Sequence, residues 1–341
     1  MSSAETKREH EVPDQPSSQT GASRIPVSVI TGFLGSGKTT LINHILHGQH
    51  GRKIAVIENE FGEVGIDSQL VEMEGQEQLI EFNNGCLCCT VRGDLIRTLD
   101  SLSKRANLDA VLIETTGLAD PAPVASTFFI ADEIKSRFNV DAFVTMVDAC
   151  NIEHSLRNSH EAQEQVAFSD VILINKTDLV SAEELKQVER RVRSLNPMAK
   201  IHYTEFGAID LSHVFGIGAF DVAAKLEVDP TFLDDLAHEH DQAIGSFVIR
   251  DDRPVDLNKF QIWLQSYLQK HGEDLFRTKG LFYARGFPER IVFQSVRMLT
   301  SLQRERRWRP GETKRTEYVV IGRNLDREEF TAGFAGCVAR S

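Results

Sequence analysis

A glycine-rich stretch at residues 32–39 carries the clearest chemistry in this sequence. It reads Gly-Phe-Leu-Gly-Ser-Gly-Lys-Thr, a full Walker A pattern, and it lies between an apolar run and a helix-forming run. Such glycines let backbone N–H groups turn inward around phosphates, while the lysine reaches the β- and γ-phosphates and the threonine hydroxyl binds Mg²⁺. The sequence therefore predicts a nucleotide site formed by Gly32, Gly35, Ser36, Gly37, Lys38, Thr39 and Thr40.

A second motif, Glu-Thr-Thr-Gly at residues 114–117, ends another apolar run. Hydrolysis needs a carboxylate near the Mg²⁺ ion and a mobile element that senses the γ-phosphate. We expect Glu114 to belong to the Mg²⁺ shell and the backbone N–H of Gly117 to lie close to the γ-phosphate. With Lys38, they form the predicted catalytic set. A simple turn at the end of a strand is the alternative interpretation.

The third motif, Asn-Lys-Thr-Asp at residues 175–178, also follows an apolar run. The Asp178 carboxylate can accept hydrogen bonds from guanine N1–H and from the exocyclic amine, a pattern that adenine cannot offer. The stem of Lys176 can pack along the base. Asn175, Lys176 and Asp178 therefore predict that the nucleotide is GTP, although alone this tetrapeptide would also fit a surface turn.

Three of the five cysteines, Cys86, Cys88 and Cys89, are crowded into four positions at the start of a predicted helix. The N-terminus of a helix lowers thiol pKa values, so thiolates are favoured there. Three thiolates and one further ligand would suit zinc or another soft ion. The alternative is that two of the three are small buried hydrophobic residues.

The elements that must position these motifs alternate along the chain. Apolar, β-branched runs predict strands at residues 27–31, 53–57, 109–113, 141–147 and 170–174, and helices are expected at 38–47, 90–105, 121–131, 159–168 and 182–194. This order predicts a P-loop NTPase-like α/β fold, a parallel sheet with helices on both faces.

The rest of the chain divides into a polar tail, a linker and a smaller domain. Residues 1–25 have almost nothing to bury and are predicted to be disordered. The α/β domain would span 26–210, a linker 211–241, and an α+β domain 242–341. In that domain we expect strands at 243–249, 280–285, 290–296 and 317–321, and helices at 256–269 and 326–336.

Charge and hydropathy limit the classes of partner. The 341 residues carry a formal charge of −12, so no global positive field attracts nucleic acid or anionic lipid. No apolar run is long enough for a membrane span, and there is no signal-peptide core, so we expect a cytoplasmic protein without a membrane partner.

Taken together, these motifs closely resemble the CobW-like P-loop GTPases, which include metallochaperones and zinc-regulated GTPase metalloprotein activators. The resemblance covers about residues 26–337. Besides residues 32–40, 114–117 and 175–178, it includes Glu-Asn-Glu-Phe-Gly-Glu at 58–63, Cys-Leu-Cys-Cys at 86–89 and the smaller C-terminal domain.

The resemblance implies a GTPase cycle that uses Mg²⁺ and controls the transfer of Zn²⁺, or of Co²⁺, to a client metalloprotein. It also implies that Glu58 and Glu63 are metal-facing carboxylates near Cys88. These glutamates follow the second strand, where a switch loop usually lies, although they could simply keep a loop solvated. A loop that touches both sites would couple GTP and metal reciprocally. The client's identity and a nucleotide- or metal-dependent homodimer stay open.

The chain departs from many relatives because only His-Glu-His-Asp at 238–241 stands where they often have a long histidine-rich tract. A large metal reservoir is therefore not expected. A short cysteine-containing docking motif associated with activation of methionine aminopeptidase is also missing from the tail, so this client is not supported.

Two other functions fit parts of the sequence. A nucleic-acid-associated GTPase would use a basic stretch with Trp308 available for stacking, although on an amphipathic helix such arginines usually only solvate its outer face. Its basic residues are Arg297, Arg304, Arg306, Arg307, Arg309, Lys314 and Arg315. A redox sensor would use the cysteine cluster as a reversible thiol switch.

Overall fold

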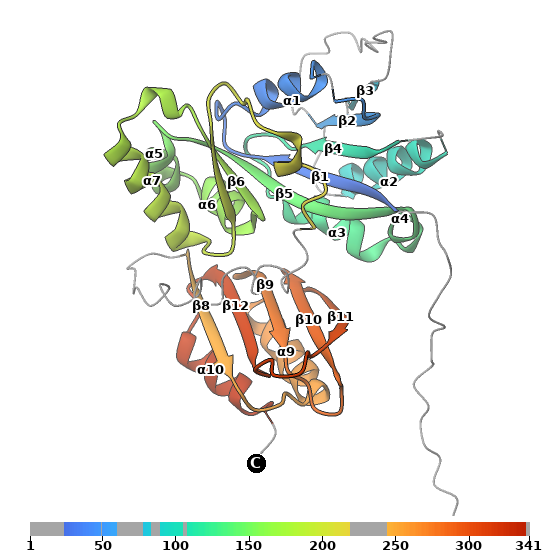
Figure 1. Ribbon diagram of the computed structural model, residues 1–341, viewed down its shortest axis with the longest axis vertical. Coiled ribbons are helices and arrows are strands. Elements are labelled where there is room, and N and C mark those ends of the chain that lie inside the picture. Colours follow the sequence, from blue (N-terminus) through green and yellow to red (C-terminus); the bar gives the residue numbers. More distant parts are fainter. Residues whose placement is uncertain are drawn as a thin grey trace, which may run out of the picture.

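The computed structural model describes residues 24–48, 50–59, 78–82, 89–104, 108–218 and 244–338. It contains two domains, each built around its own sheet (Figure 1). The large domain carries the three predicted nucleotide motifs, and the small domain follows after residue 243. Among the described helices, none is long and apolar enough to cross a membrane.

The large sheet has seven parallel strands in the order β3-β2-β4-β1-β5-β6-β7. Its central strands are almost completely buried because helices cover both faces. The predicted α/β class is thus confirmed. The strands are β1 (Ile25–Thr31), β2 (Ile54–Asn59), β3 (Gln78–Phe82), β4 (Ala110–Glu114), β5 (Phe138–Asp148), β6 (Val171–Asn175) and β7 (Lys200–Thr204).

Helices connect these strands and cover the sheet, with α1 on one face and the α2–α7 group on the other. Local signals set their ends: in α7, Ser181 and Glu184 form a reciprocal capping box. The helices are α1 (Lys38–Leu46), α2 (Cys89–Ser103), α3 (Ala122–Ile130), α4 (Asp132–Arg137), α5 (Ile152–Asn158), α6 (His160–Phe168) and α7 (Ala182–Leu195).

The packed part of the large domain continues beyond residue 210, where the linker was expected to begin. Val214 and Phe215 are buried in the core on the α1 side of the sheet. The Ser28 hydroxyl donates to the carbonyl of Val214 at 2.6 Å, and Asp141 accepts from the amide of Gly218 at 2.9 Å. Residues 211–218 are therefore part of this domain's structure.

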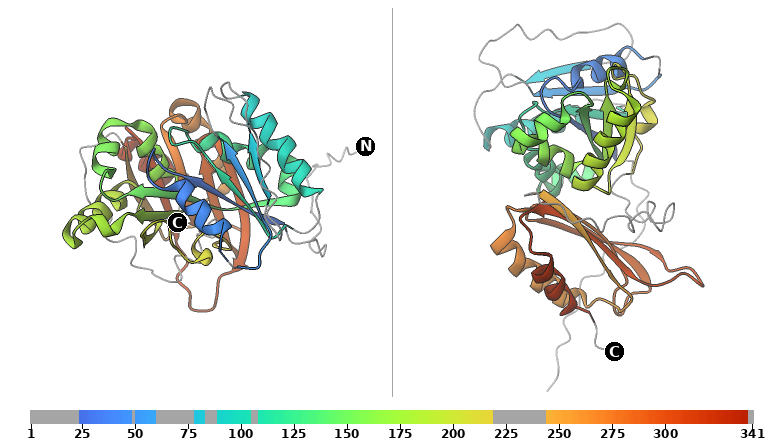
Figure 2. Two further views of the ribbon diagram at one scale, coloured as in Figure 1. Left: turned by 90° about the horizontal axis from the view of Figure 1, so that it is seen from above. Right: turned by 90° about the vertical axis from the view of Figure 1, so that its left-hand side faces the viewer.

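The small domain is an antiparallel sheet in the order β11-β10-β9-β12-β8, with two helices on one face. Those helices lie on the side turned away from the large domain (Figure 2). The elements are β8 (Ile244–Asp251), α9 (Leu257–His271), β9 (Leu275–Phe282), β10 (Glu289–Val296), β11 (Leu299–Arg307), β12 (Thr316–Arg323) and α10 (Arg327–Ala335).

Two expectations for this domain were wrong. The arginine-rich stretch before Trp308 is strand β11 rather than an amphipathic helix. Strand β9 begins at Leu275, five residues before the expected start, and it includes the charged residues Arg277 and Lys279, which are both buried. Their charges face the large domain, where an acidic partner compensates them.

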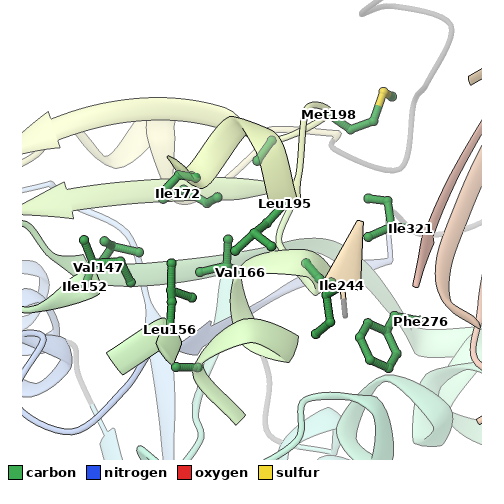
Figure 3. Close-up of a cluster of buried hydrophobic side chains, with 14 of the residues drawn as sticks. Val147, Ile152, Leu156, Val166, Ile172, Leu195, Met198, Ile244, Phe276 and Ile321 are labelled. Atoms are coloured by element: carbon green, nitrogen blue, oxygen red, sulfur yellow. The ribbon is translucent and has the colours of Figure 1, made fainter. Parts of the chain in front are cut away.

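The other face of the small sheet packs on α3, α6 and α7 of the large domain. Val166 and Leu195 from the large domain lie in one buried cluster with Ile244, Phe276 and Ile321 from the small domain (Figure 3). Beside this cluster, fully buried Asp170 accepts hydrogen bonds from Arg277, at 2.7 Å, and from Lys279. The two domains therefore share an apolar cluster and, beside it, a buried ionic cluster.

Candidate nucleotide and metal site

The glycine-rich loop between β1 and α1 has the conformation that its glycines predict. Gly32, Gly35 and Gly37 have φ values of 140°, 73° and 107°, in the left-handed region that side chains disfavour. A Cβ atom at Gly32 would lie 2.4 Å from the Met146 carbonyl oxygen, and one at Gly37 would lie 2.4 Å from Nδ2 of Asn175. The loop therefore needs glycine at these positions to keep its curvature.

Lys38 begins α1 and turns back across the loop. Its Nζ atom donates to the carbonyl oxygen of Gly32 at 2.8 Å. Burial lowers the pKa of Lys38, and the nearby charge of Glu114 opposes this effect. The Ser36 hydroxyl is buried and, among the described residues, has no hydrogen-bond partner. Thr39 and Thr40 are exposed in the first turn of α1. The loop thus holds the ammonium group of Lys38 and the hydroxyl group of Ser36, and two further hydroxyl residues follow in the first turn of α1.

Asn175 at the end of β6 connects two loops and is itself buried. Its Nδ2 atom donates to the Ser36 carbonyl at 2.9 Å, and its Oδ1 atom accepts from the Gly207 amide at 3.2 Å. This side chain therefore holds the glycine-rich loop against the loop after β7. The same strand end leads directly to Lys176 and Asp178.

Lys176 and Asp178 reach the surface beside the glycine-rich loop. Lys176 has a left-handed φ of 64° and pairs with Asp148 at 2.7 Å. Burial alone would raise the pKa of Asp148, but hydrogen bonds from Lys176, Asn151 and the Cys150 amide lower it. Asp178 is exposed. The pairing orients Lys176 and leaves the Asp178 carboxylate accessible to a base.

Two parts of this edge escaped the sequence interpretation. Asp148 ends β5, and the segment containing Phe206 and Gly207 follows β7. Both lie at the carboxyl ends of parallel strands, where the other motifs of this site also lie. The second was missed because β7 was not predicted. Phe206 is 74% exposed and has a left-handed φ of 52°. Its ring is therefore accessible to solvent, next to the hydrogen bond between Asn175 and the Gly207 amide.

The loop after β4 lies against the glycine-rich loop. The Thr115 amide donates to the Ile30 carbonyl at 2.9 Å, which continues the pairing of β4 with β1. A Cβ atom at Gly117 would lie 2.6 Å from Cδ2 of Leu34 and 2.8 Å from its amide nitrogen. Only glycine permits this approach. Gln165 of α6 secures the loop by donating to the carbonyls of Gly117 and Ala119 at 3.2 and 3.1 Å.

The predicted metal ligands Cys86, Cys88 and Glu63 lie outside the described residues. Glu58 and Cys89 are placed by their backbone alone, at the end of β2 and at the start of α2. In the sheet register Glu58 pairs with Glu114 of the neighbouring strand β4. In the described ranges no group of three or more histidine, cysteine or acidic residues could hold a metal ion.

The remaining two cysteines have no features of reactive thiols. Cys150 is exposed, but partial desolvation of its thiol and the charge of Asp148 raise its pKa. Cys337 is buried, and this burial raises its pKa to about 11. Neither thiol is activated, so a redox function would depend on residues 86–89 alone.

The basic stretch of the small domain is largely neutralised by acidic neighbours. Arg306 pairs with Glu312 at 2.9 Å, and Arg307 lies 3.7 Å from Glu289. Arg315 lies 3.4 Å from Asp252. Ion pairing of this kind lowers the positive potential that nucleic acid requires. The structure therefore gives little support to the nucleic-acid hypothesis.

The family comparisons agree with this geometry. Residues 26–203 match the model of the CobW/HypB/UreG nucleotide-binding domain, and residues 244–338 match the cobalamin synthesis protein CobW C-terminal domain. Together they cover both domains of the structure.

Individual relatives extend over nearly the whole chain. The zinc chaperone YjiA of Escherichia coli is 37% identical over 318 residues, which are 92% of this chain and 98% of that protein. The zinc-regulated GTPase metalloprotein activator 1 of Schizosaccharomyces pombe is 32% identical, covering 89% of this chain and 83% of its own. The crystal structure of Zn(II)-bound YjiA GTPase matches 93% of this chain and 100% of its own with a TM-score of 0.74 and 33% identity. The chain thus belongs to the CobW/HypB/UreG family of P-loop GTPases and carries the CobW C-terminal domain.

Proposed function

We propose that this protein is a GTP-driven zinc chaperone. It would bind zinc at the cysteines of residues 86–89, with Glu58 and Glu63 as carboxylate partners, and pass the ion to a client metalloprotein. The zinc chaperones and the metalloprotein activator among its relatives support this choice of cargo. Thiolate ligands also favour zinc over harder ions, and cobalt(II) is the second candidate.

The observation that carries the proposal is the register between β2 and β4. Glu58 pairs with Glu114, so the strand that leads into the proposed metal loop ends beside the strand that leads into the proposed phosphate-sensing loop. Neighbouring strands lie only about 4.8 Å apart. A displacement of the end of one strand would therefore displace the end of the other. This supports a direct coupling between nucleotide binding and metal binding.

The nucleotide end of the sheet fits GTP with Mg²⁺. The glycines of the loop have left-handed φ values, and a Cβ atom at Gly32 or Gly37 would collide with the neighbouring strand ends. The buried Ser36 hydroxyl has no partner among the described residues. Thr39 and Glu114 would hold Mg²⁺, which when bound neutralises charge that develops on the phosphate oxygens. Phe206 and the stem of Lys176 would flank the guanine base, and Asp178 would accept its N–H groups.

In this mechanism the protein positions groups and does not form covalent bonds with GTP. Lys38 would leave the Gly32 carbonyl to bind the β- and γ-phosphates, and the Gly117 amide would donate to the γ-phosphate. When hydrolysis removes that phosphate, the loop after β4 loses a partner and can relax. Relaxation at Glu114 would then change the position of Glu58 and weaken the hold on zinc.

The cellular compartment and the partners of this protein follow from the same chemistry. A thiolate site that exchanges zinc requires reduced cysteines, and the cycle requires GTP, so we place the activity in the cytoplasm. The client is a metalloprotein whose own ligands accept zinc from thiolates. A homodimer formed on binding nucleotide or metal is compatible with this cycle and is not needed for it.

The proposal is tested by competing the reduced protein against a zinc chelator of known affinity. A structure of the relative YjiA with one glutamate and two cysteines replaced by alanine is also described as Zn(II)-bound, so zinc binding alone does not identify the cysteine site. Cys88→Ser should weaken the tightest site about 100-fold or more, while Cys150→Ser, which alters an exposed cysteine outside the cluster, should not. Equal affinity in wild type and Cys88→Ser would refute this site.

A further inference from the structure

The small domain reaches the loop after β4 through one arginine. Arg297 lies in the turn between β10 and β11, and its Nη2 atom is 3.3 Å from Oδ2 of Asp120, 177 residues away in the chain. Asp120 stands where that loop ends and α3 begins, because its Oδ1 atom accepts from the Ala122 amide at 2.9 Å. The two carboxylate oxygens of Asp120 thus connect the loop after β4 with helix α3 and with the small domain.

Arg297 is held firmly in this place. It has a left-handed φ of 51°, which is unfavourable for a residue with a side chain. Its guanidinium lies 4.5 Å from the ring centroid of Phe276 and donates to the carbonyl of Glu273. The same Nη2 atom is also 3.3 Å from Glu164. Contacts from three directions thus fix the guanidinium in front of Asp120.

Helix α6 completes the connection from inside the large domain. Glu164 binds Arg297 and Arg323 of the small domain, and the next residue, Gln165, donates to the carbonyls of Gly117 and Ala119. Gln165 is 1% exposed, so these bonds are formed in a dry environment. Both ends of the loop are therefore held, at Gly117 by α6 and at Asp120 by the small domain. Figure 1 shows α3 and α6 on the side of the large domain that faces the small sheet.

We propose that Arg297 is a positioning residue for GTP hydrolysis, through which the small domain holds the phosphate-sensing loop by way of Asp120. This rests on the proposed role of Gly117 at the γ-phosphate. A partner that moves the small domain would break the contact with Asp120 and thereby change the rate of hydrolysis, and by reciprocity the nucleotide would change the affinity for that partner.

The test is a double-mutant cycle in GTP hydrolysis with the full-length protein. Arg297→Gln and Asp120→Asn remove the charges, and the asparagine can still accept the hydrogen bond from the Ala122 amide. Each should lower kcat about three- to tenfold with KM for GTP nearly unchanged, because the glycine-rich loop still binds the nucleotide. The double variant should be no slower than either single variant, and Arg297→Lys should recover part of the rate.

A matched control is Arg323→Gln, which breaks an interdomain ion pair with the same Glu164 but does not touch the loop. It should keep kcat within about twofold of wild type. Equal losses in Arg323→Gln and Arg297→Gln, or fully additive losses in the cycle, would overturn the proposal because they would indicate a general effect on the interface.

Gly117→Ala separates this proposal from the role of the loop itself, because its Cβ would collide with Leu34. A large loss of kcat there with an unchanged Arg297→Gln overturns only the interdomain contact. An unchanged kcat in both variants overturns the assignment of the loop as well.

Discussion

The two halves of the domain interface differ in what surrounds their charges. On the α6–α7 half, Asp170, Arg277 and Lys279 are buried beside an apolar cluster. On the α3 half, the side chains of Arg297 and Asp120 are 24% and 34% exposed, and a cavity of about 460 Å³ lies between α3 and strands β10 and β11. The first half holds the domains together, while the contact between Arg297 and Asp120 in the second half is partly open to solvent and can change.

Asp170→Asn should have the largest effect on stability. The substitution leaves two cations in a dry interface without the carboxylate that compensates them, and breaking such a buried pair costs about 3–5 kcal/mol. Denaturant unfolding at pH 7 measures the loss. Asp251→Asn, which removes an ion pair with the half-exposed Arg253, is the control and should cost less than about 1 kcal/mol. Similar values for both variants would remove the contrast between the buried and exposed halves.

Ile321→Ala should come next. Ile321 is 3% exposed in the cluster shared by the domains, and removing such a side chain leaves a cavity that costs about 2–4 kcal/mol. The variant should therefore have a lower free energy of unfolding, while its kcat for GTP hydrolysis stays close to that of the wild type. A strong loss of kcat in well-folded Ile321→Ala protein would mean that the apolar half of the interface also affects GTP hydrolysis.

The pH dependence of stability gives a smaller and more specific effect. Burial alone would raise the pKa of Asp170, but Arg277 and Lys279 lower it below its usual value. A lowered pKa in the folded protein stabilises it at pH values above the unfolded pKa of about 3.9, and this stabilisation is lost as the pH falls through the folded value. The difference between wild type and Asp170→Asn should therefore shrink below about pH 4. A difference that stays constant down to pH 2 would contradict the ionic origin.

Arg323→Gln should have the smallest effect. Its pair with Glu164 at 2.7 Å is partly exposed, so its loss should lower the free energy of unfolding by about 1 kcal/mol or less. Thermal unfolding with and without added salt measures this contribution, which screening should reduce. A loss as large as that of Asp170→Asn would show that both halves of the interface contribute equally to stability.

The sequence could predict the parts of this molecule that depend on local patterns. Glycine spacing located the nucleotide loop, and apolar runs located the central strands of the large sheet, because these are buried on both faces. The unpredicted strands β3, β7 and β11 are all at sheet edges. An edge strand packs less of its surface, so runs such as Lys-Ile-His-Tyr-Thr in β7 lack a clear apolar signal.

The interdomain contacts could not be predicted for a different reason. Arg297, Arg277 and Lys279 look like ordinary surface charges until the fold brings Asp120 and Asp170 opposite them. These partners are more than 100 residues away in the chain, and no local pattern records the pairing. The cysteine motif is the opposite case. The sequence alone indicates that it can bind a metal, but Cys86 and Cys88 lie outside the described residues.

One comparison tests whether GTP controls the binding of zinc. Zinc affinity of the reduced wild-type protein is measured by chelator competition, first with Mg²⁺ and a non-hydrolysable GTP analogue and then with Mg²⁺ and GDP. We expect the two affinities to differ by at least about fivefold, and zinc to change the affinity of the analogue relative to GDP by the same factor. Equal zinc affinities in the two nucleotide states would contradict it.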